Sequence, residues 1–162
     1  MAIENLVLTR IDDRLIHGQV MTAWLKVAPA SQIIAVDDAV AADEFLSEIM
    51  AAAAPSGIKV KVVSVDQAVP ILQQPLAEKT YLLVKTPITL TRLVAAGIPL
   101  TQVNVGGMGM NPSRKRLYKN IAASDEEVAA FRQLADAGAT VSFQIVPAER
   151  SYDLSVVVKG GK

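Results

Sequence analysis

The chain has 162 residues, of which 51% are hydrophobic, 4% are aromatic and none is cysteine, and its 16 basic residues balance its 16 acidic ones. The length fits one domain with a sizeable core, and the balanced charge excludes a general attraction to nucleic acid or anionic membranes. The lack of cysteine excludes a disulfide scaffold and cysteine-ligated metal. Without a signal-peptide pattern or an apolar run of about 18 residues, we expect a soluble, cytoplasmic protein.

Short apolar runs alternate with helical patterns along the chain. Strands are predicted over residues 4–10, 33–36, 60–63, 81–84, 103–105 and 141–146. Helices are predicted over residues 18–28, 46–53, 66–72 (capped by Asp66), 87–97 and 125–138 (with a capping box of Ser124 and Glu127). This alternation favours an α/β fold: a single open, mostly parallel, twisted sheet of about six to seven strands with helices on both faces. The residues after about 150 are weakly patterned, and residues 159–162 are expected to fray.

The loops after the first, second, fourth and fifth predicted strands carry most of the polar side chains of interest. Right-handed crossovers bring the carboxyl ends of parallel strands to one edge of the sheet, where ligands bind in open α/β folds. We therefore expect a polar rim built from Asp12, Asp13, Arg14, His17, Gly18, Asp37, Asp38, Lys85, Thr86, Asn104, Gly106 and Gly107.

The first of these loops contains His17, the only histidine in the chain. An imidazole can act as a base, a metal ligand or a nucleophile. Arg14 lies three residues earlier, and its planar fork of donors suits a phosphoryl group. Asp12 or Asp13 could orient Arg14 or fix the imidazole tautomer, and Gly18 lets backbone N–H groups at a helix start approach an anion. The loop therefore points to phosphoryl chemistry.

Plainer interpretations exist for each of these features. His17 could simply cap or pack at a helix start, and capping alone explains Thr86. The aspartates would suit a magnesium ion with phosphate rather than zinc, although we expect no resident metal. The glycines from Gly106 to Gly109 match no nucleotide-binding fingerprint, and they form either an anion-binding loop or a tight turn. The basic run Arg114–Arg116 is either a solvated face or a docking patch for an acidic partner.

The segment of residues 11–20, Ile-Asp-Asp-Arg-Leu-Ile-His-Gly-Gln-Val, closely resembles the active-site segment of a known family. That family comprises the IIB components of the bacterial sugar phosphotransferase system, of the mannose/fructose/sorbose type. The similarity continues through residues 36–43, 84–87 and 103–108, and it spans roughly residues 5–146.

The resemblance implies a phosphocarrier whose His17 accepts a phosphoryl group on Nδ1 from the phosphohistidine of a IIA component. It implies that Arg14 steadies this group and that no cofactor is needed. Asp37, Lys85, Thr86 and Asn104 are carried over as neighbours of the site. The phosphoryl group would then pass to a sugar entering through the membrane components IIC and IID, at the inner face of the membrane.

The resemblance further suggests one free-standing IIB domain over residues 1–162, while the sugar and any homo-oligomer remain open. Mannose, fructose, sorbose and N-acetylgalactosamine are all compatible with it. Two hypotheses compete with the phosphocarrier. One is a regulatory module that binds a nucleotide or phosphometabolite without covalent transfer, and the other is a magnesium-dependent phosphatase built on the paired aspartates.

Overall fold

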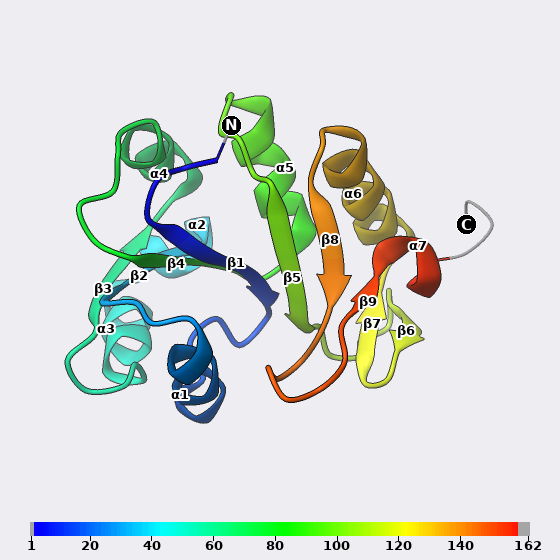
Figure 1. Ribbon diagram of the computed structural model, residues 1–162, viewed down its shortest axis with the longest axis horizontal. Coiled ribbons are helices and arrows are strands. Elements are labelled where there is room, and N and C mark those ends of the chain that lie inside the picture. Colours follow the sequence, from blue (N-terminus) through cyan, green and yellow to red (C-terminus); the bar gives the residue numbers. More distant parts are fainter. Residues whose placement is uncertain (1, 159–162) are drawn as a thin grey trace.

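The computed structural model describes residues 2–158, which form an open α/β fold around one seven-stranded sheet (Figure 1). In spatial order the strands are β3 (Lys59–Val63), β2 (Gln32–Val36), β4 (Thr80–Val84), β1 (Leu6–Asp12), β5 (Gln102–Gly107), β8 (Thr140–Phe143) and β9 (Tyr152–Asp153). The first six strands pair in parallel, and only β9 runs antiparallel to its neighbour. The predicted fold class is confirmed.

Helices cover both faces of the sheet, as Figure 1 shows. They are α1 (Gly18–Val27), α2 (Asp38–Ala41), α3 (Glu44–Ala52), α4 (Val65–Leu72), α5 (Pro87–Ala95), α6 (Asp125–Asp136) and α7 (Leu154–Val157). Helices α1 and α3 pack on one face of the sheet, whereas α4, α5 and α6 pack on the other. This division follows from right-handed crossovers, because the chain moves first toward β3 and then back toward β8.

Two hydrophobic cores result, one on each face of the sheet. Strand β4 contributes to both, because Tyr81 and Leu83 point to the α1 side while Leu82 and Val84 point to the opposite side. All five residues of β4 are buried. Burial on both faces explains why this strand, like β2, has a continuous apolar sequence instead of an alternating one.

Some predicted boundaries were wrong for local reasons. The helix expected to be capped by Asp66 begins at Val65, with Ser64 as N-cap in a capping box with Gln67. The last predicted strand ends at Phe143 rather than at residue 146. The predicted capping box of Ser124 and Glu127 is present at α6, and Pro87 occupies the first turn of α5.

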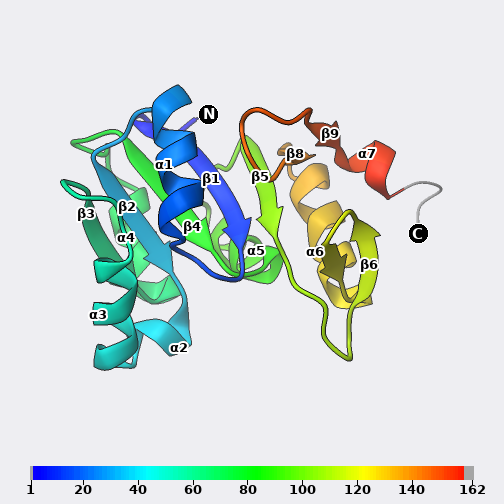
Figure 2. The same ribbon diagram turned by 90° about the horizontal axis from the view of Figure 1, so that it is seen from below.

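Several short elements were not predicted at all. The strands β6 (Lys115–Tyr118) and β7 (Ile121–Ala123) form a two-stranded antiparallel sheet beside α6 (Figure 2). The weakly patterned tail contributes β9 and α7, and α2 follows β2 directly. The prediction that residues 159–162 fray lies outside the described residues. Within residues 2–158, no helix has the length and apolar character needed to cross a bilayer.

Candidate functional site

Strand pairing brings the predicted polar loops to one edge of the sheet. Ile11 on β1 and Val36 on β2 are both in register with Val84 on β4, and Asp12 is in register with Gly107 on β5. The loops after β2, β4 and β1 therefore lie side by side at the carboxyl edge, next to the end of β5. The expected rim exists for the loops after β1, β2 and β4, and the loop carrying His17 lies near its centre. The prediction of a loop position was wrong for Asp12, Asn104, Gly106 and Gly107, because they lie within strands β1 and β5, which extend further than expected.

The β1–α1 loop is held from within by two apolar side chains. Leu15 is fully buried and has a left-handed backbone conformation with φ of 57°, which is unusual for a residue other than glycine. Ile16 is also buried. The flanking side chains lie nearer the surface, with Arg14 45% exposed and His17 half-buried. Burial of Leu15 and Ile16 thus fixes the backbone from which these two functional groups project.

His17 occupies the N-cap position of α1, and its carbonyl oxygen accepts a hydrogen bond from Met21 N–H at 2.9 Å. Its side chain makes no capping hydrogen bond. The Nδ1 atom is buried and has no hydrogen-bond partner within residues 2–158. The helix start therefore uses the backbone of His17 and leaves the imidazole uncommitted.

Arg14 is oriented by a carboxylate that is almost completely buried. Its Nε and Nη2 atoms donate to the two oxygens of Asp12 at 2.9 and 2.8 Å, and its backbone N–H donates to the same carboxylate at 3.0 Å. Asp12 is only 1% exposed. Within the described part of the chain, Nη1 of Arg14 has no partner. The fork is therefore held rigidly on one side, while its remaining donors are available to an anion.

The same carboxylate also binds Arg10, a residue that the sequence analysis missed. Arg10 is completely buried, and its Nη2 donates to Asp12 at 3.2 Å while Nη1 donates to the Asn104 side chain at 2.6 Å. Its guanidinium carbon lies 5.6 Å from the centre of the Trp24 ring. The available signal was the period of two in β1, which puts Arg10 and Asp12 on one face of the strand.

Two predicted site residues, Gly106 and Gly107, make room for this buried network. Both lie within β5, not in a turn, and a Cβ atom on Gly106 would stand 1.9 Å from the Arg10 guanidinium. A Cβ on Gly107 would stand 2.6 Å from the Asp12 carboxylate. The interpretation of these two glycines as a tight turn is therefore wrong, and close approach of buried side chains explains them.

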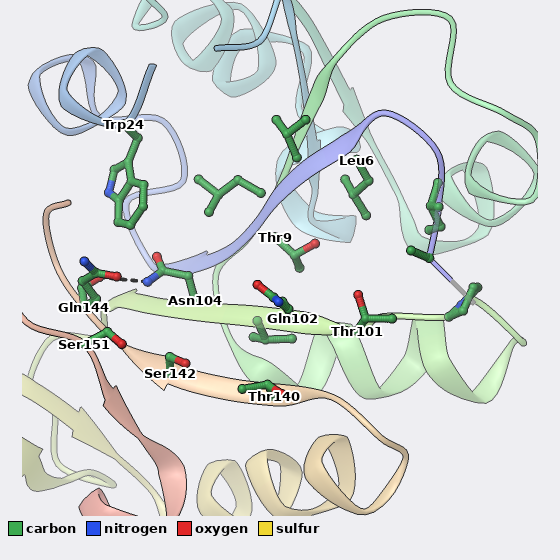
Figure 3. A pocket seen from close by; sticks show the side chains of 16 residues that line it. Leu6, Thr9, Trp24, Thr101, Gln102, Asn104, Thr140, Ser142, Gln144 and Ser151 are labelled. Atoms are coloured by element: carbon green, nitrogen blue, oxygen red, sulfur yellow. Dashed lines mark hydrogen bonds between the residues drawn. The ribbon is translucent and has the colours of Figure 1, made fainter. Parts of the chain in front are cut away.

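Asn104 belongs to the same network, underneath the loop. Its side chain accepts from Arg10 and donates to the Gln144 carbonyl at 3.0 Å. It also borders a groove of about 320 Å³ on the sheet face over β1, β5 and β8, beside Trp24 (Figure 3). None of the residues that line this groove belongs to the loop of residues 13–18. The histidine site is therefore at the sheet edge, separate from the groove.

Asp13 turns away from Asp12 and toward the loop that follows β5. Its Oδ2 atom accepts from Gly109 N–H at 2.8 Å and pairs with Arg114 at 3.2 Å. The sequence predicted a solvated or docking face for Arg114–Arg116, and the structure agrees with exposure only at Lys115 and Arg116. The side chain of Arg114 is 8% exposed.

The remaining rim residues divide into helix caps and uncommitted groups. Asp37 caps α2 by accepting from Val40 N–H, while Asp38 accepts from Val65 N–H and pairs with Arg92.

Lys85 is half-buried and makes no hydrogen bond or ion pair with any other residue in the range 2–158. Thr86 is the N-cap residue of α5 but forms no side-chain capping bond, so the interpretation of this threonine as a side-chain cap is wrong. A Cβ on Gly18 would stand 3.3 Å from the Ala53 carbonyl, so this glycine allows α1 to approach the end of α3. The side chains of Lys85 and Thr86 thus join the His17 imidazole and the Nη1 atom of Arg14 as polar groups without a partner within residues 2–158.

Acid is expected to destabilise the protein through Asp12 and Glu127. Burial would raise the pKa of each carboxyl, but hydrogen bonds from Arg14 to Asp12 and from Arg114 to Glu127 outweigh it and lower the pKa. Below the unfolded-state pKa of about 4, the unfolded chain therefore binds more protons than the native one. The contribution of these two carboxylates to the free energy of unfolding is complete above that pKa. It is lost as the pH falls through the pKa values of the native state. Urea unfolding at pH 2.5 to 6 checks this, and an unfolding free energy that stays constant below pH 4 would contradict it.

The fold and the site together define a class of protein. An open α/β sheet presents a histidine and an oriented arginine at its carboxyl edge, which is the arrangement of a domain that handles a phosphate-like anion. Residues 6–162 match the family model described as the sorbose subfamily IIB component of the phosphotransferase system, the PTS. The chain belongs to this family and is a phosphotransferase component of a sugar PTS, as the resemblance predicted.

Individual relatives agree with this assignment. The chain is 36% identical over 157 residues to the fructose-specific EIIB component of Bacillus subtilis, covering 96% of each. The crystal structure of the IIBSor domain of the Klebsiella pneumoniae sorbose permease superposes with a TM-score of 0.86 at 37% identity, covering 95% of this chain and 94% of that one. The mannose-specific EIIAB component of Escherichia coli is 38% identical over 129 residues, which cover 78% of this chain but only 40% of that longer protein.

Proposed function

We propose that His17 carries a phosphoryl group from the phosphohistidine of a IIA protein to a sugar at the membrane components IIC and IID. The observation that carries this proposal is that an oriented Arg14 fork and an uncommitted His17 imidazole project from the same short loop at the carboxyl edge of the sheet. Asp12 holds two atoms of that fork, and Nη1 remains available. Phosphoryl transfer needs such positioning and charge stabilisation more than covalent help from the protein.

In the transfer step, a lone pair on a ring nitrogen of His17 attacks phosphorus in line with the donor nitrogen. A new N–P bond forms as the donor N–P bond breaks. The leaving imidazole keeps the electron pair of the broken bond and takes up a proton, while the His17 ring gives up the proton on its other nitrogen. Arg14 stabilises the equatorial oxygens of the moving group. The family resemblance assigns attack to Nδ1, which is buried here. Attack from that atom requires rotation of the ring about its Cβ–Cγ bond.

The neighbouring loops supply the rest of the phosphate-binding set in this proposal. Lys85 follows β4, the strand paired with β1, and its ammonium group has no partner within residues 2–158. The hydroxyl of Thr86 and the backbone N–H groups at the start of α1, including Gly18, provide further donors. Asp13 and Asp37 support the loops and do not touch the phosphoryl group, because their carboxylates already accept backbone N–H groups.

The engaged carboxylates favour this function over a magnesium-dependent phosphatase. Asp12 binds two arginines, Asp13 binds Arg114, and Asp37 caps a helix, so none of these is left to coordinate a metal. Residues 2–158 contain no cluster of three or more histidine, cysteine, aspartate or glutamate side chains that could hold a metal ion. No specific contact favours the alternative of a non-covalent regulatory module.

The partners follow from the same proposal. The mannose-specific relative from E. coli is named an EIIAB component, a name that combines IIA and IIB in one protein. This supports a IIA domain as the donor for His17. The acceptor complex of IIC and IID would hold the protein at the cytoplasmic face of the membrane. The names of the relatives include fructose, sorbose and mannose, and the substrate is a sugar of this class.

The test is to incubate the protein with a IIA protein that has been phosphorylated by its own donor, and then to measure intact mass. We expect one added phosphoryl group, labile in acid, that maps to His17 and returns to unphosphorylated IIA. Nuclear magnetic resonance of the modified ring then distinguishes Nδ1 from Nε2. Absence of the group with a IIA protein that phosphorylates a known IIB protein would overturn the proposal.

A further inference from the structure

We propose that Arg114 is a positioning residue for phosphoryl transfer, acting on the His17 loop through Asp13. Arg114 and Asp13 are 101 residues apart in sequence, yet their side chains pair at 3.2 Å. The inference rests on the proposed function, because it concerns the rate at which His17 accepts a phosphoryl group. Neither Arg114 nor Asp13 is assigned contact with that group.

Arg114 closes a small polar triangle at the end of β5. Its Nη1 donates to Asp13 Oδ2 at 3.2 Å and to the Gly109 carbonyl at 2.8 Å, while Gly109 N–H donates to the same Asp13 oxygen at 2.8 Å. Asp13, in the loop after β1, is therefore tied to the segment after β5 by two contacts, one from Arg114 and one from Gly109 N–H, and Arg114 also holds Gly109. Each loop alone would have more conformational freedom.

The other side of the guanidinium is anchored to a helix. Nε and Nη2 of Arg114 donate to the two oxygens of Glu127 at 2.8 Å each, in the forked geometry that gives strong pairing. Glu127 is 6% exposed and also accepts from Ser124 N–H at 2.9 Å in the capping box of α6. Because α6 packs on the sheet, Glu127 holds Arg114 in a fixed position, and Arg114 in turn restricts the movement of Asp13.

The charge of Arg114 also keeps Arg14 available for the phosphoryl group, because it compensates the nearby Asp13 carboxylate. The hydrogen bonds with Asp12 are the main cause of the raised pKa of Arg14, and the negative charge of the next residue, Asp13, is close enough to add to it. The ion pair with Arg114 compensates the negative charge of Asp13. Without Arg114, the Asp13 carboxylate would compete with the phosphoryl group for Arg14 and would repel an incoming anion. The expected loss is therefore in the transfer step, and donor docking should be preserved.

The experiment compares Arg114→Gln with Lys115→Gln in transfer from phosphorylated IIA. Both substitutions remove one positive charge at adjacent positions, but Lys115 is exposed and takes part in none of the triangle contacts. We expect Arg114→Gln to lower the maximal rate roughly 10- to 100-fold, as a displacement of about 1 Å does, with KM for IIA within about twofold of the wild-type value. Lys115→Gln should leave both constants unchanged.

Two further variants separate positioning from simple structural damage. Arg114→Lys keeps the charge but not the fork, and should give an intermediate rate. Adding Asp13→Asn to Arg114→Gln removes the unpaired carboxylate, and should recover several-fold of the lost rate. A purely structural role predicts no such recovery, because the double variant lacks still more of the contacts.

The outcomes distinguish this inference from the proposed function. If wild-type protein accepts phosphoryl groups and Arg114→Gln matches Lys115→Gln, the positioning role is overturned while the carrier function remains. A change in KM alone would also overturn it, in favour of docking. If the wild-type protein and Lys115→Gln both fail to accept a phosphoryl group from a competent donor, the carrier function and the inference fall together.

Discussion

Replacing His17 by glutamine is expected to abolish phosphoryl uptake from IIA, by at least about 10⁴-fold, as removal of a nucleophile does in other enzymes. The chain contains no second histidine that could substitute. The fold should survive, because the His17 side chain makes no capping bond and its Nδ1 has no partner within residues 2–158. Mass measurement after incubation with phosphorylated IIA, together with circular dichroism, checks both parts.

A matched control lies on the same helix. Lys26→Gln changes an exposed residue in the last turn of α1, and wild-type uptake is expected. Arg14→Gln should retain His17 but slow uptake by about 10²–10³-fold, which is the usual effect of removing one transition-state donor. A His17→Gln protein that still gains an acid-labile phosphoryl group would mean that the acceptor is another residue.

Replacing Asp12 by asparagine is expected to destabilise the protein by about 3–5 kcal/mol, because it leaves the buried Arg10 cation without its counter-charge. A typical domain has only about 5–15 kcal/mol of stability, so this is a large fraction. Arg10 and Asp12 are 0% and 1% exposed, and Arg14 depends on the same carboxylate for its orientation. Urea unfolding measures the loss, and the rate of phosphoryl uptake measures the effect on Arg14.

The corresponding surface control is Glu78→Gln. Glu78 pairs with Lys59 at 2.9 Å, but Lys59 is 71% exposed, so no measurable change in unfolding is expected. A double variant with Arg10→Met and Asp12→Asn removes both buried charges, and its destabilisation should be smaller than the sum of the two single effects. If the Asp12→Asn variant has the same free energy of unfolding as the Glu78→Gln variant, the buried network does not contribute to stability as expected.

The two aspartates at the end of β1, Asp12 and Asp13, support the site in two different directions. Asp12 points inward and holds Arg10 and Arg14, whereas Asp13 points across the sheet edge to Arg114. Arg14, which we propose faces the phosphoryl group, is thus fixed by one carboxylate, and the loop that bears it is fixed by the other. This division allows His17 and Arg14 to remain accessible to partner proteins while their backbone stays ordered.

The sequence by itself was enough to predict the open α/β sheet, most of its strands and helices, and the position of the His17 loop at the carboxyl edge of the sheet. These features depend on apolar periodicity, capping residues and a short motif, all of which involve residues close together in the chain. The prediction missed α2, β9 and α7, because elements of two to four residues are too short to show a period.

Only the tertiary structure revealed which residues support the site. The sequence predicted a strand ending at Arg10, an anion-binding loop or a tight turn at Gly106, and a solvated face or a docking patch at Arg114. In the structure Arg10 and Arg114 are buried in ion pairs, and Gly106 makes room for Arg10. Strand order decided these contacts, since it places β5 beside β1 and the loop after β5 beside Asp13. Local periodicity carries no information about such pairings, because their energy comes from burial and charge compensation between distant segments.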